Sequence, residues 1–288
     1  MVIKRKRLPE WLRKRNPYDR NIIETKQILS KLGLESVCQN AKCPNMGECF
    51  TNRTATFMIM GNICTRNCNF CAVKNGKPIP LDRNEPHQLA QAVKELGLKH
   101  VVITSVTRDD LLDGGAVQFV RCINEIRKLE SKIYIEVLTS DFQMNRAALE
   151  HLIKARPDIF NHNIETVPRL YPGIRPEADY QRSLMVLDYA KKLNNEIFTK
   201  SGIMLGLGET KDEIIEVMED LLYINCDILT IGQYLQPGRS HIPVDKYIKP
   251  EEFEEYKEIG KKLGFKYIAS GPLVRSSYNA EDFSKKYL

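Results

Sequence analysis

The sequence lacks any long hydrophobic run, and no stretch approaches the ~20 consecutive apolar residues that a membrane-spanning helix requires. The basic residues near the N-terminus, Lys4 to Arg7, are not followed by the apolar segment of a secretory signal. Paired CxxC motifs, which are typical of structural zinc sites, are also missing. We therefore expect no membrane association and a reducing, cytoplasmic setting.

Positive charge is in small excess, with 43 Lys and Arg against 37 Asp and Glu residues and a net charge of +6. Much of the excess lies in residues 1–20. A basic arm of this kind suits the docking of an acidic protein domain. The alternative is that the arm is a solvated tail without a binding role.

Six of the eight cysteines lie between Cys38 and Cys71, in two sets of three. The first set is Cys38, Cys43 and Cys49 (CxxxxCxxxxxC), and the second set is Cys64, Cys68 and Cys71 (CxxxCxxC). A zinc site would leave each set one ligand short, and nothing indicates the oxidising compartment that disulfides need. Three cysteines on an iron–sulfur cluster leave one iron open to another ligand. The two remaining cysteines, Cys122 and Cys226, have apolar neighbours and are expected to be small buried hydrophobes.

The second set, with Phe70 just before its last cysteine, resembles the cluster motif of the radical S-adenosylmethionine (SAM) superfamily. In that superfamily the open iron is chelated by the methionine part of SAM. An electron from the cluster then breaks a C–S bond and produces a 5′-deoxyadenosyl radical, which no side chain can generate alone.

After Thr54, apolar runs alternate with segments of helical period, as expected for parallel strands joined by crossover helices. The expected strands are 57–63, 99–106, 132–138, 158–163, 197–206, 227–235 and a short seventh at 266–270; the expected helices are 86–96, 116–129, 145–155, 182–193, 212–224 and 251–263. This pattern predicts an α/β fold, a partial (βα)6 TIM-type barrel over residues 55–270. A cysteine-rich N-terminal extension (1–54), with a helix at 21–32, precedes the barrel, and a tail (271–288) follows it.

Active sites of such barrels lie at the carboxyl ends of the strands, where this sequence is polar. The motifs there are TRDD at 107–110 with Gly114 and Gly115, residues 139–141, NHNIE at 161–165, GLGET at 206–210 and GQYLQPG at 232–238. Each has a structural explanation, since glycines begin or cap helices and the scarce histidine His162 could be a hydrogen-bonded core residue. As a set they favour function, because a bound nucleoside needs partners from several strands.

The whole chain resembles the lipoyl synthase family of radical SAM enzymes. The motifs that carry the resemblance are, in order, CQNAKCPNMGEC, CTRNCNFC, TSVTRDDLLDGGA, NHNIETVPRLYPGIRP, KSGIMLGLGE, GQYLQP and RSSYNA.

The resemblance implies roles for particular residues. Cys64, Cys68 and Cys71 would hold the SAM-cleaving [4Fe-4S] cluster, and Cys38, Cys43 and Cys49 an auxiliary [4Fe-4S] cluster whose fourth ligand is a serine of RSSY. Of the two serines we choose Ser277 over Ser276. A serine oxygen of either residue is a poor ligand for soft iron–sulfur chemistry and easily released, as suits a cluster that the family is thought to dismantle for its sulfur. The expected SAM contacts are Thr107, Asp109, Asn163, Glu165 and Arg175.

The implied reaction is insertion of two sulfur atoms at carbons 6 and 8 of an octanoyl chain on a lysine of a lipoyl carrier domain. Two SAM are consumed, and the unactivated C–H bonds require a radical because no base of ordinary pKa could remove those protons. The expected partners are a 2-oxoacid dehydrogenase lipoyl domain or the glycine cleavage H protein, an electron donor such as flavodoxin or ferredoxin, and an iron–sulfur carrier that rebuilds the auxiliary cluster. No nucleic acid or membrane partner is expected.

Other classes remain as alternatives. A radical SAM methylthiotransferase or a biotin-synthase-like sulfur inserter would share CxxxCxxC, although a methylthiotransferase usually carries a further nucleic-acid-binding domain. A cluster carrier without catalysis would not need polar motifs at five strand ends. Cleavage of SAM to 5′-deoxyadenosine distinguishes an enzyme from a carrier.

Overall fold

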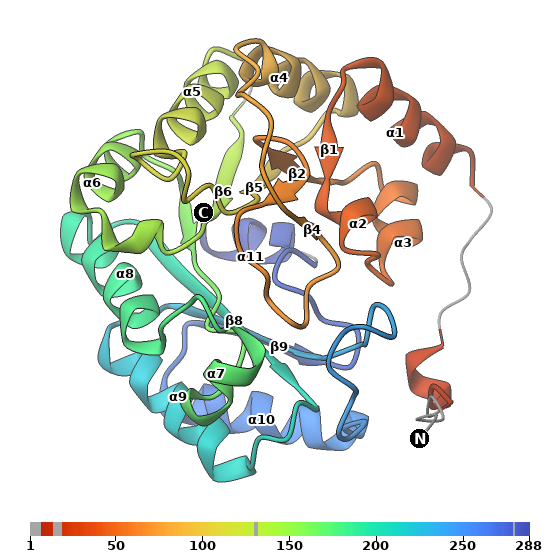
Figure 1. The fold of residues 1–288 in the computed structure, drawn as a ribbon, viewed down its shortest axis with the longest axis vertical. Helices are drawn as coiled ribbons and strands as arrows, with labels where there is room; N and C mark the ends of the chain where they lie inside the picture. The colour runs from red at the N-terminus through yellow and green to blue at the C-terminus, as the bar shows by residue number, and fades with distance from the viewer. Residues whose placement is uncertain (1–6, 14–18, 130–131, 279) are drawn as a thin grey trace.

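A computed structural model describes residues 7–13, 19–129, 132–278 and 280–288 (Figure 1). One sheet has the strand order β1-β2-β5-β6-β7-β8-β9-β10, in which every neighbouring pair is parallel except the antiparallel pair of β1 and β2. The helices that follow the strands cover its outer side (Figure 1). The sheet is therefore an open barrel with β1 and β10 at its edges.

Six βα units and a final strand build this barrel, as the sequence predicts. They are β2 (Thr56–Ile59), α4 (Glu85–Leu96), β5 (His100–Ser105), α5 (Ala116–Arg127), β6 (Tyr134–Leu138), α6 (Arg146–Lys154), β7 (Ile159–Asn161), α8 (Tyr180–Leu193), β8 (Phe198–Leu205), α9 (Lys211–Tyr223), β9 (Ile228–Gln233), α10 (Pro250–Leu263) and β10 (Tyr267–Gly271). The α/β partial barrel is thus confirmed.

Shorter elements surround the barrel. They are η1 (Glu10–Leu12), α1 (Arg20–Lys31), β1 (Glu35–Ser36), α2 (Val37–Asn40), α3 (Met46–Thr51), β3 (Ile63–Cys64), β4 (Lys74–Asn75), η2 (Phe142–Met144), η3 (Pro168–Leu170), α7 (Tyr171–Ile174) and α11 (Ala280–Tyr287).

Local sequence explains where the helices begin and end. The Thr210 hydroxyl accepts the backbone N–H of Glu213 and the Glu213 carboxylate accepts that of Thr210, which begins α9 with a capping box. Gly97, at φ +68°, ends α4 in the left-handed conformation that glycine adopts without strain. The strands between are buried on both faces, so they show no polar alternation.

One boundary prediction is wrong. The apolar run 57–63 was expected to be one strand, but β2 ends at Ile59 because Met60 (φ +67°) and Gly61 (φ +83°) turn the chain through the left-handed region. This early turn lifts the second cysteine set above the end of β2 instead of continuing the sheet. Cys122 and Cys226 are 0% and 2% exposed, which confirms them as buried core residues.

The N-terminal stretch joins the sheet through β1, and its helices α2 and α3 lie against the β2 edge (Figure 1). The tail after β10 reaches the same place from the other edge: Asn45 Nδ2 donates to Leu273 O at 2.6 Å, and Tyr278 Oη donates to Glu48 Oε1 at 2.7 Å. The division of the chain at residues 54 and 270 stays a prediction. The basic arm lies largely outside the described residues, which exclude 1–6 and 14–18.

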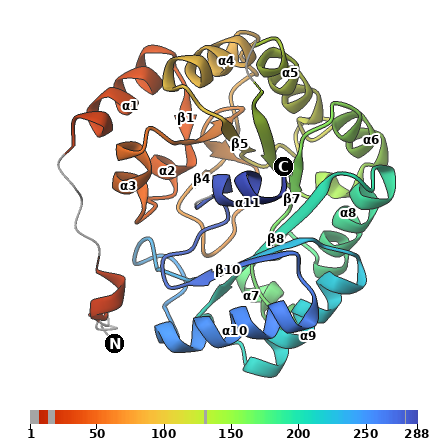
Figure 2. The ribbon, with the colours of Figure 1, turned by 180° about the vertical axis from the view of Figure 1, so that it is seen from behind.

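An ion pair lies inside the barrel. The ammonium of Lys200, on β8, donates to both carboxylate oxygens of Glu136, on β6, at 2.9 Å, and both side chains are buried. His100 lies 3.6 Å from the same carboxylate. At the rear of the barrel α11 covers the start of β5 (Figure 2), where the Ser284 hydroxyl and His100 Nδ1 lie 2.5 Å apart.

Candidate active site

The second cysteine set occupies the loop between β2 and α4, at the carboxyl end of the barrel. The short pair of β3 with β4 closes this loop. Cys64 Sγ accepts backbone N–H groups of Thr107 at 3.3 Å and Arg66 at 3.5 Å. Burial raises the pKa of the Cys71 thiol to about 12 and raises that of Cys68 as well. Such thiols become thiolates when a metal replaces the proton, so they suit metal ligands better than free nucleophiles.

The first set is held by two short helices. Cys38 lies in α2 and Cys49 in α3, while Cys43 lies in the turn between them, where its N–H donates to the Cys38 carbonyl at 3.0 Å. Burial raises the pKa of the Cys38 thiol to about 11. The three sulfurs therefore come from one compact segment against β2.

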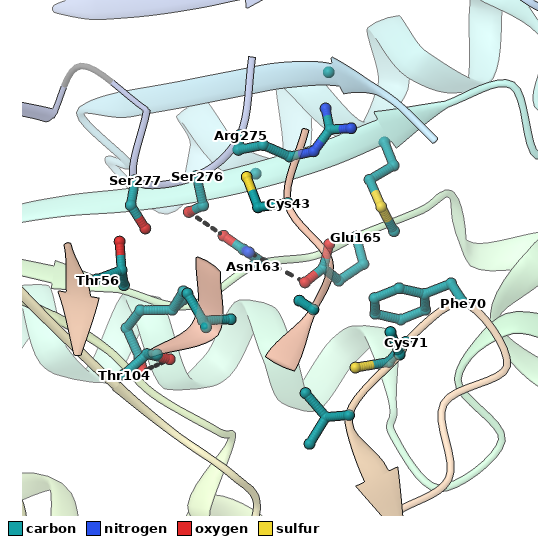
Figure 3. Close-up of a pocket in the computed structure, with 18 of the residues that line it drawn as sticks. Cys43, Thr56, Phe70, Cys71, Thr104, Asn163, Glu165, Arg275, Ser276 and Ser277 are labelled. Atoms are coloured by element: carbon teal, nitrogen blue, oxygen red, sulfur yellow. Dashed lines mark hydrogen bonds between the residues drawn. The ribbon is translucent and has the colours of Figure 1, made fainter. Parts of the chain in front are cut away.

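All six of these cysteines line one cavity of about 510 Å³, the front cavity. Figure 3 shows Cys43 beside the tail serines and Cys71 beside Phe70, with Asn163 and Glu165 between them. The barrel thus places both cysteine sets around a common chamber, one on each side.

The tail reaches this chamber by passing close over β9. A Cβ on Gly232 would lie 2.1 Å from the carbonyl oxygen of Val274, so a side chain at this position would push the tail away. Beyond it, the Ser276 hydroxyl accepts a hydrogen bond from Asn161 Nδ2 at 2.8 Å and donates one to Asn163 Oδ1 at 2.9 Å. Among the described residues the Ser277 side chain has no hydrogen-bond partner, and it lines the front cavity.

Glu165 and Arg175 form the polar floor between the two sets. Glu165 adopts φ +71°, its N–H donates to the Gly202 carbonyl at 2.8 Å, and its carboxylate accepts from Asn163 Nδ2 at 3.1 Å. Burial raises the pKa of Glu165, and Arg175 opposes that shift. Arg175 Nη1 donates to the carbonyls of Asn163 and Ile164, both at 3.0 Å. A carboxylate and a guanidinium therefore face one chamber, ready for a zwitterionic ligand.

Within the described ranges, every helix is too short or too polar to cross a membrane.

Comparison with known proteins agrees with this geometry. Residues 58–221 match the family model of the radical SAM superfamily. The chain is 59% identical to a lipoyl synthase of Caldanaerobacter subterraneus subsp. tengcongensis over 276 residues, which cover 96% of each protein. It is 55% identical to a lipoyl synthase of Pseudomonas fluorescens (strain Pf0-1), with 96% of this chain and 82% of that protein covered. The chain belongs to the lipoyl synthase family.

Solved structures share the fold at low identity. Methylornithine synthase (PylB) is 15% identical with a TM-score of 0.55, covering 86% of this chain and 84% of that one. HydG, a maturase of the [FeFe]-hydrogenase, is 14% identical with a TM-score of 0.52, covering 90% of this chain and 74% of that one. These likenesses show the radical SAM partial barrel and nothing finer.

As a lipoyl synthase of the radical SAM type, the protein uses two [4Fe-4S] clusters and SAM. Each cysteine set offers three thiols to the chamber, and a cluster held by three cysteines keeps one iron open for a further ligand. Among the described residues no group of three or more His, Cys, Asp or Glu side chains is arranged to hold a single metal ion. All eight cysteines are free thiols, so the disulfide alternative is not formed.

Not every residue expected at the lipoyl synthase site lines the chamber. Thr107, Asn163, Glu165 and Arg175 do. Asp109 instead pairs with Arg66, with Oδ2 2.6 Å from Nε and Oδ1 3.0 Å from Nη2, and lies outside the lining. His162 lines the chamber although it is only 1% exposed; its Nδ1 lies 2.9 Å from the Thr139 carbonyl oxygen, and burial lowers its pKa to about 4.

Sequence reasoning missed three residues at the site. The Arg66 guanidinium donates to both Asp109 and Asp141, with Arg66 Nη2 2.6 Å from Asp141 Oδ1. These ion pairs hold the cysteine loop in place. His241 Nε2 donates to the Cys71 carbonyl at 2.9 Å from a loop after β9. Arg275 brings a positive charge toward Cys43 (Figure 3). Arg66 and Arg275 could have been suspected from their places inside the CTRNC and RSSY motifs; His241 carries no such signal.

Proposed function

We propose that this chain inserts two sulfur atoms at carbons 6 and 8 of an octanoyl group carried on a lysine of a lipoyl domain. The observation that carries the proposal is that both cysteine sets, Ser277 and a carboxylate–guanidinium floor line one chamber. The bound clusters and SAM supply the carbon radical and the sulfur; the chain's own residues hold them and keep water away.

We assign Cys64, Cys68 and Cys71 to the SAM-cleaving cluster. Three features support this: the CxxxCxxC spacing, the position at the carboxyl ends of the strands, and the backbone N–H groups that donate to Cys64. Backbone donors to sulfur tune and stabilise the charge of a bound cluster. For SAM itself we propose Thr107, Asn163, Glu165 and Arg175 as contacts, because these residues line the chamber beside this set.

For Asp109 we propose an indirect role instead of a SAM contact, since it lies outside the chamber lining and both of its carboxylate oxygens accept from Arg66. Its charge acts through that arginine on the loop that carries Cys64 and Cys68. The proposal therefore separates residues that face the chamber from one that supports its wall.

We assign Cys38, Cys43, Cys49 and Ser277 to the auxiliary cluster. Ser276 already uses its hydroxyl in two hydrogen bonds, to Asn161 and Asn163, whereas Ser277 faces the chamber without a hydrogen-bond partner among the described residues. Binding iron through Ser276 would break its hydrogen bond to Asn163, because the hydroxyl must give up the proton that it donates, and binding through Ser277 breaks none. The polar contacts thus favour Ser277 as the fourth ligand.

The identities of the partner proteins are also part of the proposal. We propose a 2-oxoacid dehydrogenase lipoyl domain or the glycine cleavage H protein as substrate, flavodoxin or ferredoxin as electron donor, and an iron–sulfur carrier for cluster rebuilding, all in the cytoplasm. Free thiols at every cysteine support a reducing compartment.

Mass spectrometry of an octanoyl-lysine peptide after incubation with reconstituted enzyme, SAM and dithionite tests the proposal. The expected product has gained two sulfur atoms, and two equivalents of 5′-deoxyadenosine accompany it. Formation of 5′-deoxyadenosine with an unchanged peptide in saturating substrate would reject sulfur insertion on this substrate while leaving the radical chemistry intact.

A further inference from the structure

The first cysteine set is reached from two sides of the barrel. A second cavity of about 410 Å³, the rear cavity, lies between α3, the connection from α4 to β5, and α11. Both cavities are lined by Cys38, Cys49, Thr56, Ser277 and Tyr278. Cys43 and the whole second set line only the front cavity. Three of the four residues proposed for the auxiliary cluster, Cys38, Cys49 and Ser277, therefore lie in the wall between two chambers.

The two cavities open at opposite ends of the barrel. Ser105 and Thr107, at and beyond the end of β5, line the front cavity, whereas Lys99 and His100, at its start, line the rear cavity. Because the barrel strands from β2 to β10 are parallel, their starts and ends lie at opposite faces of the sheet. The rim of the rear cavity includes the exposed residues Asn52, Gly97 and Lys99.

Helix α11 lies over the rear end of the barrel (Figure 2), and its residues Ala280, Glu281, Asp282 and Lys285 line the rear cavity. The helix is attached through three residues: the Phe283 ring contacts those of Phe198 (centroids 4.9 Å apart) and Tyr267 (5.7 Å), Ser284 reaches His100, and Tyr287 Oη donates to the Lys266 carbonyl at 2.9 Å. Just before the helix, Tyr278 Oη donates to Glu48 Oε1 at 2.7 Å, across the wall between the chambers. Local opening of this eight-residue helix has to break these contacts but leaves the sheet intact.

We propose that iron and sulfide reach the first cysteine set through the rear cavity when the auxiliary cluster is built, and that its iron leaves by the same route, with α11 as the cover; the sulfur leaves on the product in the front cavity. The inference rests on the proposed function, which places that cluster on the first set. Carboxylates of Glu48, Glu281 and Asp282 line this cavity together with the ammonium groups of Lys99 and Lys285, and Lys285 pairs with Glu281 at 3.1 Å. Carboxylate oxygens are ligands that an entering ferrous ion accepts. The front cavity is filled by SAM and the acyl chain during turnover, so a rear route lets iron pass without crossing the chamber where the radical forms.

Thiol labelling of the apoprotein tests the route without any cluster. The variant Lys99→Trp places a large side chain at the rear rim, and Lys94→Trp is the matched control, since Lys94 is also exposed but does not line the cavity. Iodoacetamide labelling is followed for each cysteine by mass spectrometry. We expect Lys99→Trp to slow the labelling of Cys49 several-fold and to leave Cys43 unchanged, with Lys94→Trp like the parent protein.

A second variant changes the cover. Phe283→Ala removes the aromatic anchor of α11 and should speed the labelling of Cys49, with little effect on Cys64 in the front cavity. Equal Cys49 labelling in Lys99→Trp and Lys94→Trp, both shown folded by circular dichroism, overturns the route whatever the cluster content is.

Iron release from the reconstituted holoenzyme links the route to the cluster. With dithionite and a ferrous chelator, Lys99→Trp should slow the release of about half of the iron, since two cubanes hold equal numbers of irons. Slowed Cys49 labelling together with slowed release supports the inference. Slowed labelling with unchanged release overturns this role of the cavity. A separate variant with Cys38, Cys43 and Cys49 replaced by Ala tests the assignment of the cluster. If that variant holds as much iron as the parent protein, the proposed cluster assignment itself fails.

Discussion

The side-chain amide of Asn161 donates a hydrogen bond to the Ser276 hydroxyl at 2.8 Å, although 115 residues separate the two in the chain. The same amide nitrogen donates to Glu136 Oε1 at 2.7 Å, and Glu136 is fully buried beside Lys200. The tail is therefore anchored to the charged interior of the barrel, one residue before the serine proposed as a cluster ligand. This anchoring makes the position of Ser277 a property of the fold.

Replacing Cys64, Cys68 and Cys71 together by Ala should remove the SAM-cleaving cluster. Reconstituted parent protein should hold about eight irons, because two cubanes carry four each, and the variant about half as many. The variant should form no 5′-deoxyadenosine, since no open iron remains for SAM. Iron and sulfide analysis with chromatography of the nucleoside products checks both expectations. Undiminished SAM cleavage would refute the assignment of the second set.

Replacing Cys38, Cys43 and Cys49 by Ala should have the complementary effect. The second set lies on a separate loop closed by β3 and β4, so its cluster should survive with about four irons. We expect continued, uncoupled formation of 5′-deoxyadenosine and no sulfur-containing peptide in mass spectrometry. Normal product from this variant would rule out the first set as the sulfur source.

The buried ion pair predicts a pH-dependent stability. Burial acts to raise the pKa of Glu136, but Lys200 and His100 outweigh it and lower the pKa to about 2 from an ordinary 4.5. A carboxylate whose pKa is lowered in the folded state stabilises the fold at pH values above its pKa in the unfolded chain. This contribution, about 3 kcal/mol, is lost as the pH falls from about 4.5 to about 2. The free energy of unfolding of the apoprotein, measured with urea from pH 7 to pH 3, should therefore fall with pH, and Glu136→Gln should lack this fall.

Glu136→Gln should also be less stable at pH 7 by about 3 kcal/mol or more, since it leaves the Lys200 ammonium buried without its partner. Glu216→Gln, at an exposed position of α9, is the matched control and should follow the parent profile. An unchanged acid profile in Glu136→Gln would mean that other carboxylates set the acid stability.

The barrel was predictable from sequence because each unit is a local pattern: an apolar strand, a capped helix and a polar turn. The early end of β2 could not be predicted, since the only sequence signal for the left-handed turn at Met60 is the glycine that follows it. Helices α2 and α3 are too short to form alone; α2 depends on packing against β1 and β2, and α3 on packing against α1. The Arg66–Asp109 pair and the anchoring of Ser276 join residues far apart in the chain, which periodicity cannot reveal.

The two tail serines give the sharpest test of the site. Ser277→Cys replaces a hard, releasable oxygen by a soft thiolate that iron holds more firmly, so the variant should keep its auxiliary cluster but lose most lipoyl product. Ser276→Ala removes two hydrogen bonds, to Asn161 and Asn163, and should lower the free energy of unfolding by about 1–3 kcal/mol. Its iron content should stay near that of the parent, and its product yield should fall far less than that of Ser277→Cys.

The structure supplies the control that separates these roles. Asn161→Ala deletes the donor to Ser276 without changing either serine, and it also deletes the donor to Glu136, so it should lose at least as much stability as Ser276→Ala and differ from Ser277→Cys in product. If the two serines are interchangeable in function, the single variants will lose product equally. If Ser276→Ala abolishes product while Ser277→Cys remains fully active, the ligand is Ser276, and its hydrogen bond to Asn163 must break when the cluster binds.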